Sequence, residues 1–127
     1  MPGTAGLSAY RQTIGATLSG RELEAAIFTK AANLLKGCLA HWDEKDNFRR
    51  LGEALTYNQR IWTIFQDELT KADNPLPIKI RENILTLSVF VDKRIVDVMA
   101  HPEPEKLAIL IDINQNLAAG LRGSPAQ

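Results

Sequence analysis

The sequence of 127 residues predicts an all-α fold, a compact bundle of four main helices plus a short N-terminal helix, in a single domain. Three observations support this prediction. Apolar residues recur every three to four positions in four long segments, which is the period of an amphipathic helix. No segment alternates apolar and polar residues like a half-buried strand, and no Asn-Gly hairpin turn occurs. Proline-rich breaks separate the later segments.

The first two predicted elements are a short helix and a long one. Residues 1–6 are rich in Gly and Pro and are expected to be disordered. Residues 7–18 form the short helix, on an apolar stripe of Leu7, Tyr10, Ile14 and Leu18. Ser19 and Glu22 have the spacing of a capping box, so the long helix begins there and runs to about residue 42. Its stripe consists of Leu23, Ile27, Ala31, Leu34, Cys38 and Trp42.

Two proline-containing breaks delimit the remaining helices. The third helix is predicted over residues 45–71, with an apolar face of Phe48, Leu51, Leu55, Trp62, Phe65 and Leu69. Residues 74–77 end it, because proline disfavours a helical residue before it. The fourth helix, over residues 78–99, is apolar almost all round, which predicts that it is the central helix. The last helix spans residues 105–121 and ends near Gly120 and Gly123, before a disordered tail at 123–127.

The composition restricts the classes of partner. The formal net charge is +0, from 15 basic and 15 acidic residues, which argues against direct nucleic-acid binding. The single cysteine, Cys38, cannot form an internal disulfide and lies in an apolar run, so it is expected to be a small buried hydrophobe. Neither a secretory signal nor a membrane-spanning stretch is visible, so we expect a cytoplasmic protein that makes no membrane contact.

The sequence contains no motif that carries catalytic chemistry. It has no phosphate-binding glycine loop, no HExxH motif and no Cys/His cluster, and its 2 histidines stand far apart. The serines lack a nucleophile-elbow context. We therefore predict no catalytic residues, no metal site and no cofactor, and we expect that the protein is not an enzyme.

Several aromatic and amide residues have two interpretations. The helical spacing of Trp42, Trp62 and Phe65 favours core packing, and the alternative is a ligand cage or a platform for bases. Tyr57 lies off the main apolar stripe and is either a partner contact or an ordinary surface residue. Asn58 and Asn114 interrupt apolar faces. They are either buried amides that fix helix register or polar anchors in a partner groove.

Three basic pairs also have two interpretations. They are Arg49-Arg50, Lys79 with Arg81, and Lys93-Arg94. Local salt bridges and solvation explain them, and contact with nucleic acid is the alternative.

Short motifs follow one another in a fixed order along the chain. They are Ala9-Tyr10, Arg21 to Glu24, Ala54-Leu55, Asn58, Ile61-Trp62, Leu76-Pro77, Arg81, Val91-Asp92-Lys93-Arg94, Leu110-Ile111-Asp112-Ile113-Asn114 and Gly120-Leu121. In order and spacing this set resembles the FlaF family of flagellar biosynthesis regulators, from about residue 9 to 121. The chain departs from the family at Phe90, where Trp is common, and at Tyr57, which replaces a residue that is often apolar or Trp.

The resemblance implies a regulator of flagellin synthesis and secretion that acts by protein binding. Such a protein would hold unassembled flagellin in a chaperone-like way and oppose FlbT-type repression of flagellin mRNA. Flagellin is the implied partner and FlbT a second one; the alternative is a post-transcriptional regulator that contacts flagellin mRNA directly or through FlbT. The residues predicted to bind the partner are Tyr57, Asn58, Ile61, Phe65, Leu110, Ile113, Asn114 and Leu117.

Overall fold

The structure, a computed structural model, describes residues 20–123. Within this range the chain forms four α-helices and one 3₁₀ helix, and no β-strand. The elements are α2 (Gly20–Ala40), α3 (Asn47–Leu69), α4 (Ile78–Ala100), η1 (Pro104–Lys106) and α5 (Leu107–Leu121). The all-α prediction is confirmed. The helix predicted over residues 7–18, the Ser19 cap and the segments 1–6 and 124–127 lie outside the described residues.

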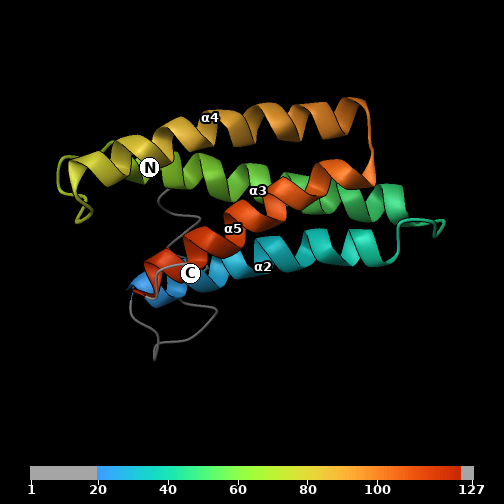
Figure 1. The fold of residues 1–127 in the computed structure, drawn as a ribbon, viewed down its shortest axis with the longest axis horizontal. Coiled ribbons are helices and arrows are strands. Elements are labelled where there is room, and N and C mark those ends of the chain that lie inside the picture. The colour runs from blue at the N-terminus through green and yellow to red at the C-terminus, as the bar shows by residue number, and fades with distance from the viewer. Residues whose placement is uncertain (1–19, 124–127) are drawn as a thin grey trace.

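Helices α2, α3 and α4 lie side by side with α3 in the middle, and α5 runs obliquely in front of α3 and α2 (Figure 1). Helix α3 packs against α2 and α4, whereas α5 packs mainly against α2. The short connections make neighbouring helices antiparallel, as in a helical bundle.

The hydrophobic core lies where α2, α3 and α5 meet. Helices α2 and α5 make the most extensive contact between two elements. Ala25 and Ala32 on α2 and Ala118 on α5 are fully buried. Small side chains at a helix contact allow the two axes to approach closely, which fits the extensive contact between α2 and α5.

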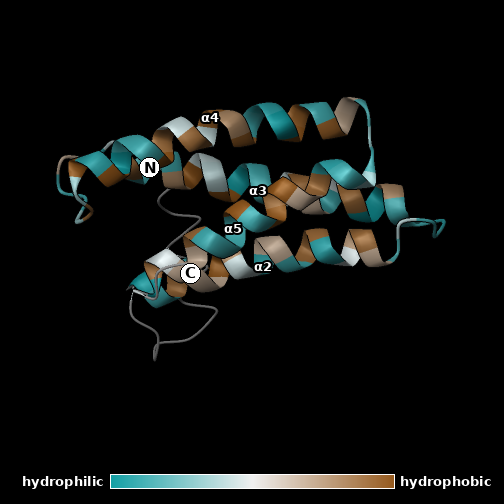
Figure 2. Cartoon of the chain, viewed as in Figure 1, coloured by the Kyte–Doolittle hydropathy of each residue, from teal (hydrophilic) through white to brown (hydrophobic). Residues whose placement is uncertain are grey.

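Helix α4 lies at the edge of the bundle, so the prediction that it is central is wrong (Figure 1). Its main neighbour is α3, and its buried residues are Ser88, Val91, Ile95 and Val98. Hydrophobic residues occur along its whole length (Figure 2), and several of them remain at the surface. The exposed large apolar side chains on α4 are Ile78, Ile80, Val89, Phe90, Val96 and Met99.

The proline-containing turn at residues 74–77 separates α3 from α4, as predicted. Asn74 holds this turn: its Nδ2 donates to the Glu68 carbonyl and its Oδ1 accepts from the Leu76 amide, both at 3.0 Å. Arg81 in α4 donates from Nη1 to the Lys71 carbonyl at 3.0 Å. Side chains thus supply partners for backbone groups that the end of α3 leaves without intrahelical bonds.

The remaining differences from the predicted elements concern helix ends. Helix α2 ends at Ala40, and α3 covers Asn47–Leu69, two residues shorter at each end than predicted. Gly123, with a φ of 78°, ends the turn after α5, and its amide donates to the Gly120 carbonyl at 3.0 Å. Phe48, which its spacing assigned to the apolar face, is 76% exposed, whereas Leu51 on the same predicted face is buried.

Candidate functional site

Three buried side chains connect α2, α3 and α5 by hydrogen bonds. Asn114 on α5 donates from Nδ2 to Asn58 Oδ1 on α3 at 2.6 Å, and its Oδ1 accepts from Trp62 Nε1 at 3.0 Å. Asn58 Nδ2 donates to the carbonyls of Ala54, at 2.9 Å, and Ala31 on α2, at 3.3 Å. Asn58 is 0% exposed and Asn114 1%. Every amide nitrogen and oxygen of the two asparagines therefore has a partner.

This network favours one of the two interpretations of the asparagines. Both are buried amides that hold two helices in one register, because a shift of either helix would leave polar atoms without partners in the core. A buried asparagine is expected to bond to a helix end or a loop. Here each asparagine instead bonds to the other one, 56 positions away in the sequence. That pairing has no local sequence signal.

The aromatic residues around this network pack edge to face. The ring centroids of Phe28 and Trp62 lie 5.3 Å apart, those of Phe28 and Phe65 5.1 Å, and those of Trp62 and Phe65 6.3 Å. These are favourable geometries for aromatic pairs. Core packing is thus confirmed for Trp62 and Phe65, whereas Trp42 is only partly buried at the margin of the core.

The eight predicted partner-binding residues fall into two groups. Tyr57 and Leu117 are partly exposed and pack against the core from outside. The other six are buried: Asn58, Ile61, Phe65, Leu110, Ile113 and Asn114. The partner-binding role stays a prediction for all eight, but the buried six would reach a partner only if the core opened.

Charged side chains lie close to Tyr57 and to two of the basic pairs on the surface. The Lys30 ammonium lies 5.1 Å from the centroid of the Tyr57 ring, a cation–π distance. Arg49 forms ion pairs with Asp46, at 3.6 Å, and Glu53, at 3.0 Å. Local salt bridging thus accounts for Arg49, and Arg81 is held by the loop before α4.

The exposed apolar face of α4 is the surface that the sequence interpretation missed. Five apolar residues on this side of α4 follow coiled-coil spacing, and we call them the outer seam: Ile78, Val89, Val96 and Met99, which are exposed, and Leu85, which is partly buried against the core. Ile78 is 65% exposed, Val89 52% and Val96 59%. The all-round apolar pattern of residues 78–99 is the sequence signal for this seam, but the same pattern also predicts a central helix.

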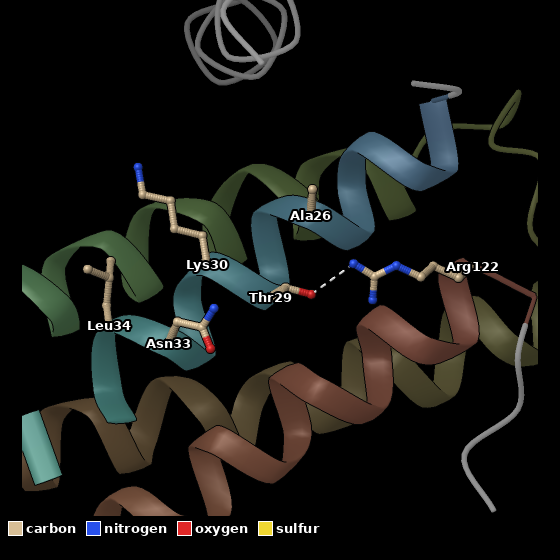
Figure 3. Close-up of a pocket in the computed structure, with 6 residues that line it drawn as sticks. All are labelled: Ala26, Thr29, Lys30, Asn33, Leu34 and Arg122. Atoms are coloured by element: carbon tan, nitrogen blue, oxygen red, sulfur yellow. Dashed lines mark hydrogen bonds between the residues drawn. The ribbon is translucent and has the colours of Figure 1, made fainter. Parts of the chain in front are cut away.

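The remaining surface of residues 20–123 is hollowed beside the end of α5. A shallow hollow of about 350 Å³ lies on α2 beside the end of α5, lined by Ala26, Thr29, Lys30, Asn33, Leu34 and Arg122 (Figure 3). Arg122 reaches across it and donates from Nη2 to Thr29 Oγ1 at 3.1 Å. No group of three or more metal-ligating side chains occurs within residues 20–123. None of the helices in that range is long and apolar enough to cross a membrane.

Comparison with known proteins gives one family. The model of the family described as flagellar protein FlaF matches residues 7–121. The matched range includes all four described α-helices, and the match confirms the resemblance inferred from the motifs. No curated protein and no solved structure matches the chain significantly.

Proposed function

The chain belongs to the FlaF family of flagellar proteins, and on that premise we propose that it regulates flagellin synthesis and secretion by binding unassembled flagellin. In this role it acts in the cytoplasm as a chaperone-like factor. By engaging flagellin it opposes the repression of flagellin mRNA that an FlbT-type regulator exerts. The function is one of binding, and it involves no chemical step and no cofactor.

The observation that carries this proposal is the outer seam of α4. A binding protein for a helical partner needs exposed apolar side chains at helical spacing, beyond what its own core requires. The outer seam provides them along a regular helix of 23 residues. Its neighbour α3 keeps α4 in place through contacts on the other, inner face of the helix, which consists of Ser88, Val91, Ile95 and Val98.

The chemistry of flagellin suits this surface. The ends of flagellin are amphipathic helices whose apolar faces lack partners before polymerisation. Such a helix, laid along α4, would cover the outer seam and remove the apolar faces of both proteins from water. The net charge of +0 gives flagellin no long-range electrostatic attraction, so the burial of apolar surface must supply most of the affinity.

Calorimetric titration of the full chain with monomeric flagellin tests the proposal. We expect binding with a negative heat-capacity change, the signature of apolar burial. Val89→Asp should weaken binding by about tenfold or more, because an unpaired carboxylate would be pressed against apolar side chains. Asn83→Asp is the matched control, since Asn83 is an exposed α4 residue outside the seam. Equal affinities for the two variants would contradict this site, and no binding by the wild-type chain would contradict the function.

A parallel titration with the leader of flagellin mRNA addresses the alternative function. If the chain contacts the RNA directly, binding should appear at low salt and weaken steeply as salt is added, because phosphate contacts release counterions. Binding to RNA without binding to flagellin would replace our proposal with direct post-transcriptional regulation.

A further inference from the structure

One end of the bundle is hollowed where four parts of the chain meet. The hollow, of about 260 Å³, lies between the start of α2, the end of α3, the loop after α3 and the end of α5. Its apolar lining consists of Phe65, Pro75, Leu76 and Leu121. We call it the end hollow. The outer-seam residues do not line it, so it is a different surface from the one that we assign to flagellin.

The chain enters the bundle at this hollow. Gly20, the first residue of α2, is itself part of the lining. Residues 1–19 are therefore tethered directly beside the hollow. The family match begins at residue 7, so the domain includes most of this segment as well as the four described α-helices. The hollow thus has a candidate occupant within the same chain.

We propose that residues 7–18 form a helix that crosses this end of the bundle and packs its apolar stripe against the end hollow. The stripe consists of Leu7, Tyr10, Ile14 and Leu18, which recur every three to four positions. An isolated helix shorter than about 12–15 residues is marginal in water, so a helix of this length requires a surface to pack on.

The connection to α2 restricts where this helix can lie. Only Ser19 separates residue 18 from Gly20 at the start of α2. Two antiparallel helices need a connection of about 2–5 residues, so the segment cannot fold back along α2. If it continued the axis of α2, it would run beyond the bundle and leave its apolar stripe in water. A path across the end of the bundle avoids both problems and covers the end hollow.

The length of the segment matches this path. A helix over residues 7–18 is about 18 Å long, and neighbouring helix axes lie about 8–10 Å apart, so it spans two such steps. Because α3 lies between α2 and α4, the path leads from the start of α2 over the end of α3 to the start of α4 (Figure 1).

The start of α4 offers apolar surface at the far end of this path. The buried residues of α4 begin only at Ser88, so the apolar side chains of residues 78–87 are all at least partly exposed. Ile80, in the first turn, is 46% exposed. In the proposed arrangement the beginning of the segment, near Leu7, covers this turn.

The charges of the two surfaces also favour this occupant. Arg11 is the single charged side chain in residues 7–18, and it lies beside the stripe because it follows Leu7 by four positions. The lining of the end hollow carries two carboxylates, those of Glu24 and Glu68, and one cation, that of Arg21. The positive charge of Arg11 offsets this acidic excess.

Paramagnetic relaxation measured by NMR tests the position of the segment. The full chain carries a nitroxide at Ser8→Cys in a Cys38→Ala background, and Ser8 lies off the apolar stripe. We expect broadened amide signals for residues 78–84 and unchanged signals for residues 41–47, at the opposite end of the bundle. The added substitution Ile14→Asp should remove the broadening. Unchanged signals at 78–84, or broadening that Ile14→Asp leaves in place, would overturn the proposal.

A mixture of nitroxide-labelled chain and isotope-labelled chain without the nitroxide distinguishes an intramolecular contact from one between copies. We expect no broadening in the isotope-labelled copy. Broadening of residues 78–84 in that copy would assign the contact to a second chain and overturn the intramolecular path.

Thermal unfolding gives an independent test. Ile14→Asp should lower the melting temperature by about 3 °C or more, because it presses a carboxylate against the apolar lining. Gln12→Asp is the matched control, since it introduces the same charge off the stripe and should have little effect. Equal melting temperatures of the two variants would overturn the packing of the stripe.

This inference does not rest on the proposed function. Because the end hollow and the outer seam are different surfaces, Ile14→Asp should leave the affinity for flagellin unchanged, whereas Val89→Asp should weaken it. A chain whose segment crosses the bundle end but that binds no flagellin overturns only the proposed function. A chain that binds flagellin but shows no broadening at residues 78–84 overturns only this inference.

Discussion

Replacement of Asn114 by alanine tests whether the buried amide network holds the bundle together. The substitution removes the acceptor of Trp62 Nε1 and the donor to Asn58 Oδ1, which the wild-type chain pairs at 3.0 and 2.6 Å. Trp62 and Asn58 are fully buried, so water does not readily replace the lost partner. Each orphaned polar atom costs about 1–3 kcal/mol, so Asn114→Ala should lower the free energy of unfolding by about 2–6 kcal/mol.

Urea denaturation followed by tryptophan fluorescence measures this loss. A domain of this kind is stable by about 5–15 kcal/mol, so the expected loss moves the urea midpoint far beyond experimental error. Asn116→Ala is the matched control, because Asn116 is an exposed amide on the same helix. Its effect should stay within about 0.5 kcal/mol.

A double-mutant cycle then isolates the contact between the two amides. Asn58→Ala leaves Asn114 Nδ2 without its acceptor, whereas the double variant removes both amides and orphans only Trp62 Nε1. The two losses should therefore fail to add, with a coupling energy of about 0.5–3 kcal/mol. Additive losses, or an Asn114→Ala effect no larger than that of Asn116→Ala, would refute the reasoning.

Three further predictions concern the core. Burial raises the pKa of the Cys38 thiol above its ordinary value of 9.0, against the opposing effect of the Arg50 charge. Cys38 should resist alkylation in the native chain and react in urea; fast native labelling would contradict its burial. Because the thiolate is disfavoured in the folded chain, stability should fall as pH rises above 9.0, and less so in Cys38→Ala. Ala118→Leu should lower the free energy of unfolding by about 1–3 kcal/mol, because the larger side chain overpacks the contact between α2 and α5. Ala108→Leu, at an exposed position, is the control and should leave thermal unfolding nearly unchanged. Equal effects of the two substitutions would contradict the close approach of α2 and α5.

Local patterns predicted the position of each described helix. The proline turn at residues 74–77 and the glycine at position 123 act within a few residues of the helix ends that they produce, so their effect is visible in the sequence. The likeness to the FlaF family also came from the sequence, through the order of its motifs, and the family match confirms it.

The roles of the candidate site residues were harder to predict from the sequence than the positions of the helices. Buried and partner-binding apolar residues have the same composition and period, so Ile61, Phe65 and Leu110 could be assigned to either role. Only the packing of α3 and α5 against α2 shows that these residues belong to the core.

The sequence by itself determined the all-α class, the four described α-helices and their approximate ends, because hydrophobic period and helix-breaking residues act over short distances. The tertiary structure decided which faces find a neighbour. It placed α4 at the edge of the bundle beside α3, paired Asn58 with Asn114 across 56 positions, and left most of the outer seam of α4 exposed among the described helices. A hydrophobic pattern indicates that a helix face is apolar, but only the arrangement of the helices determines which element packs against that face.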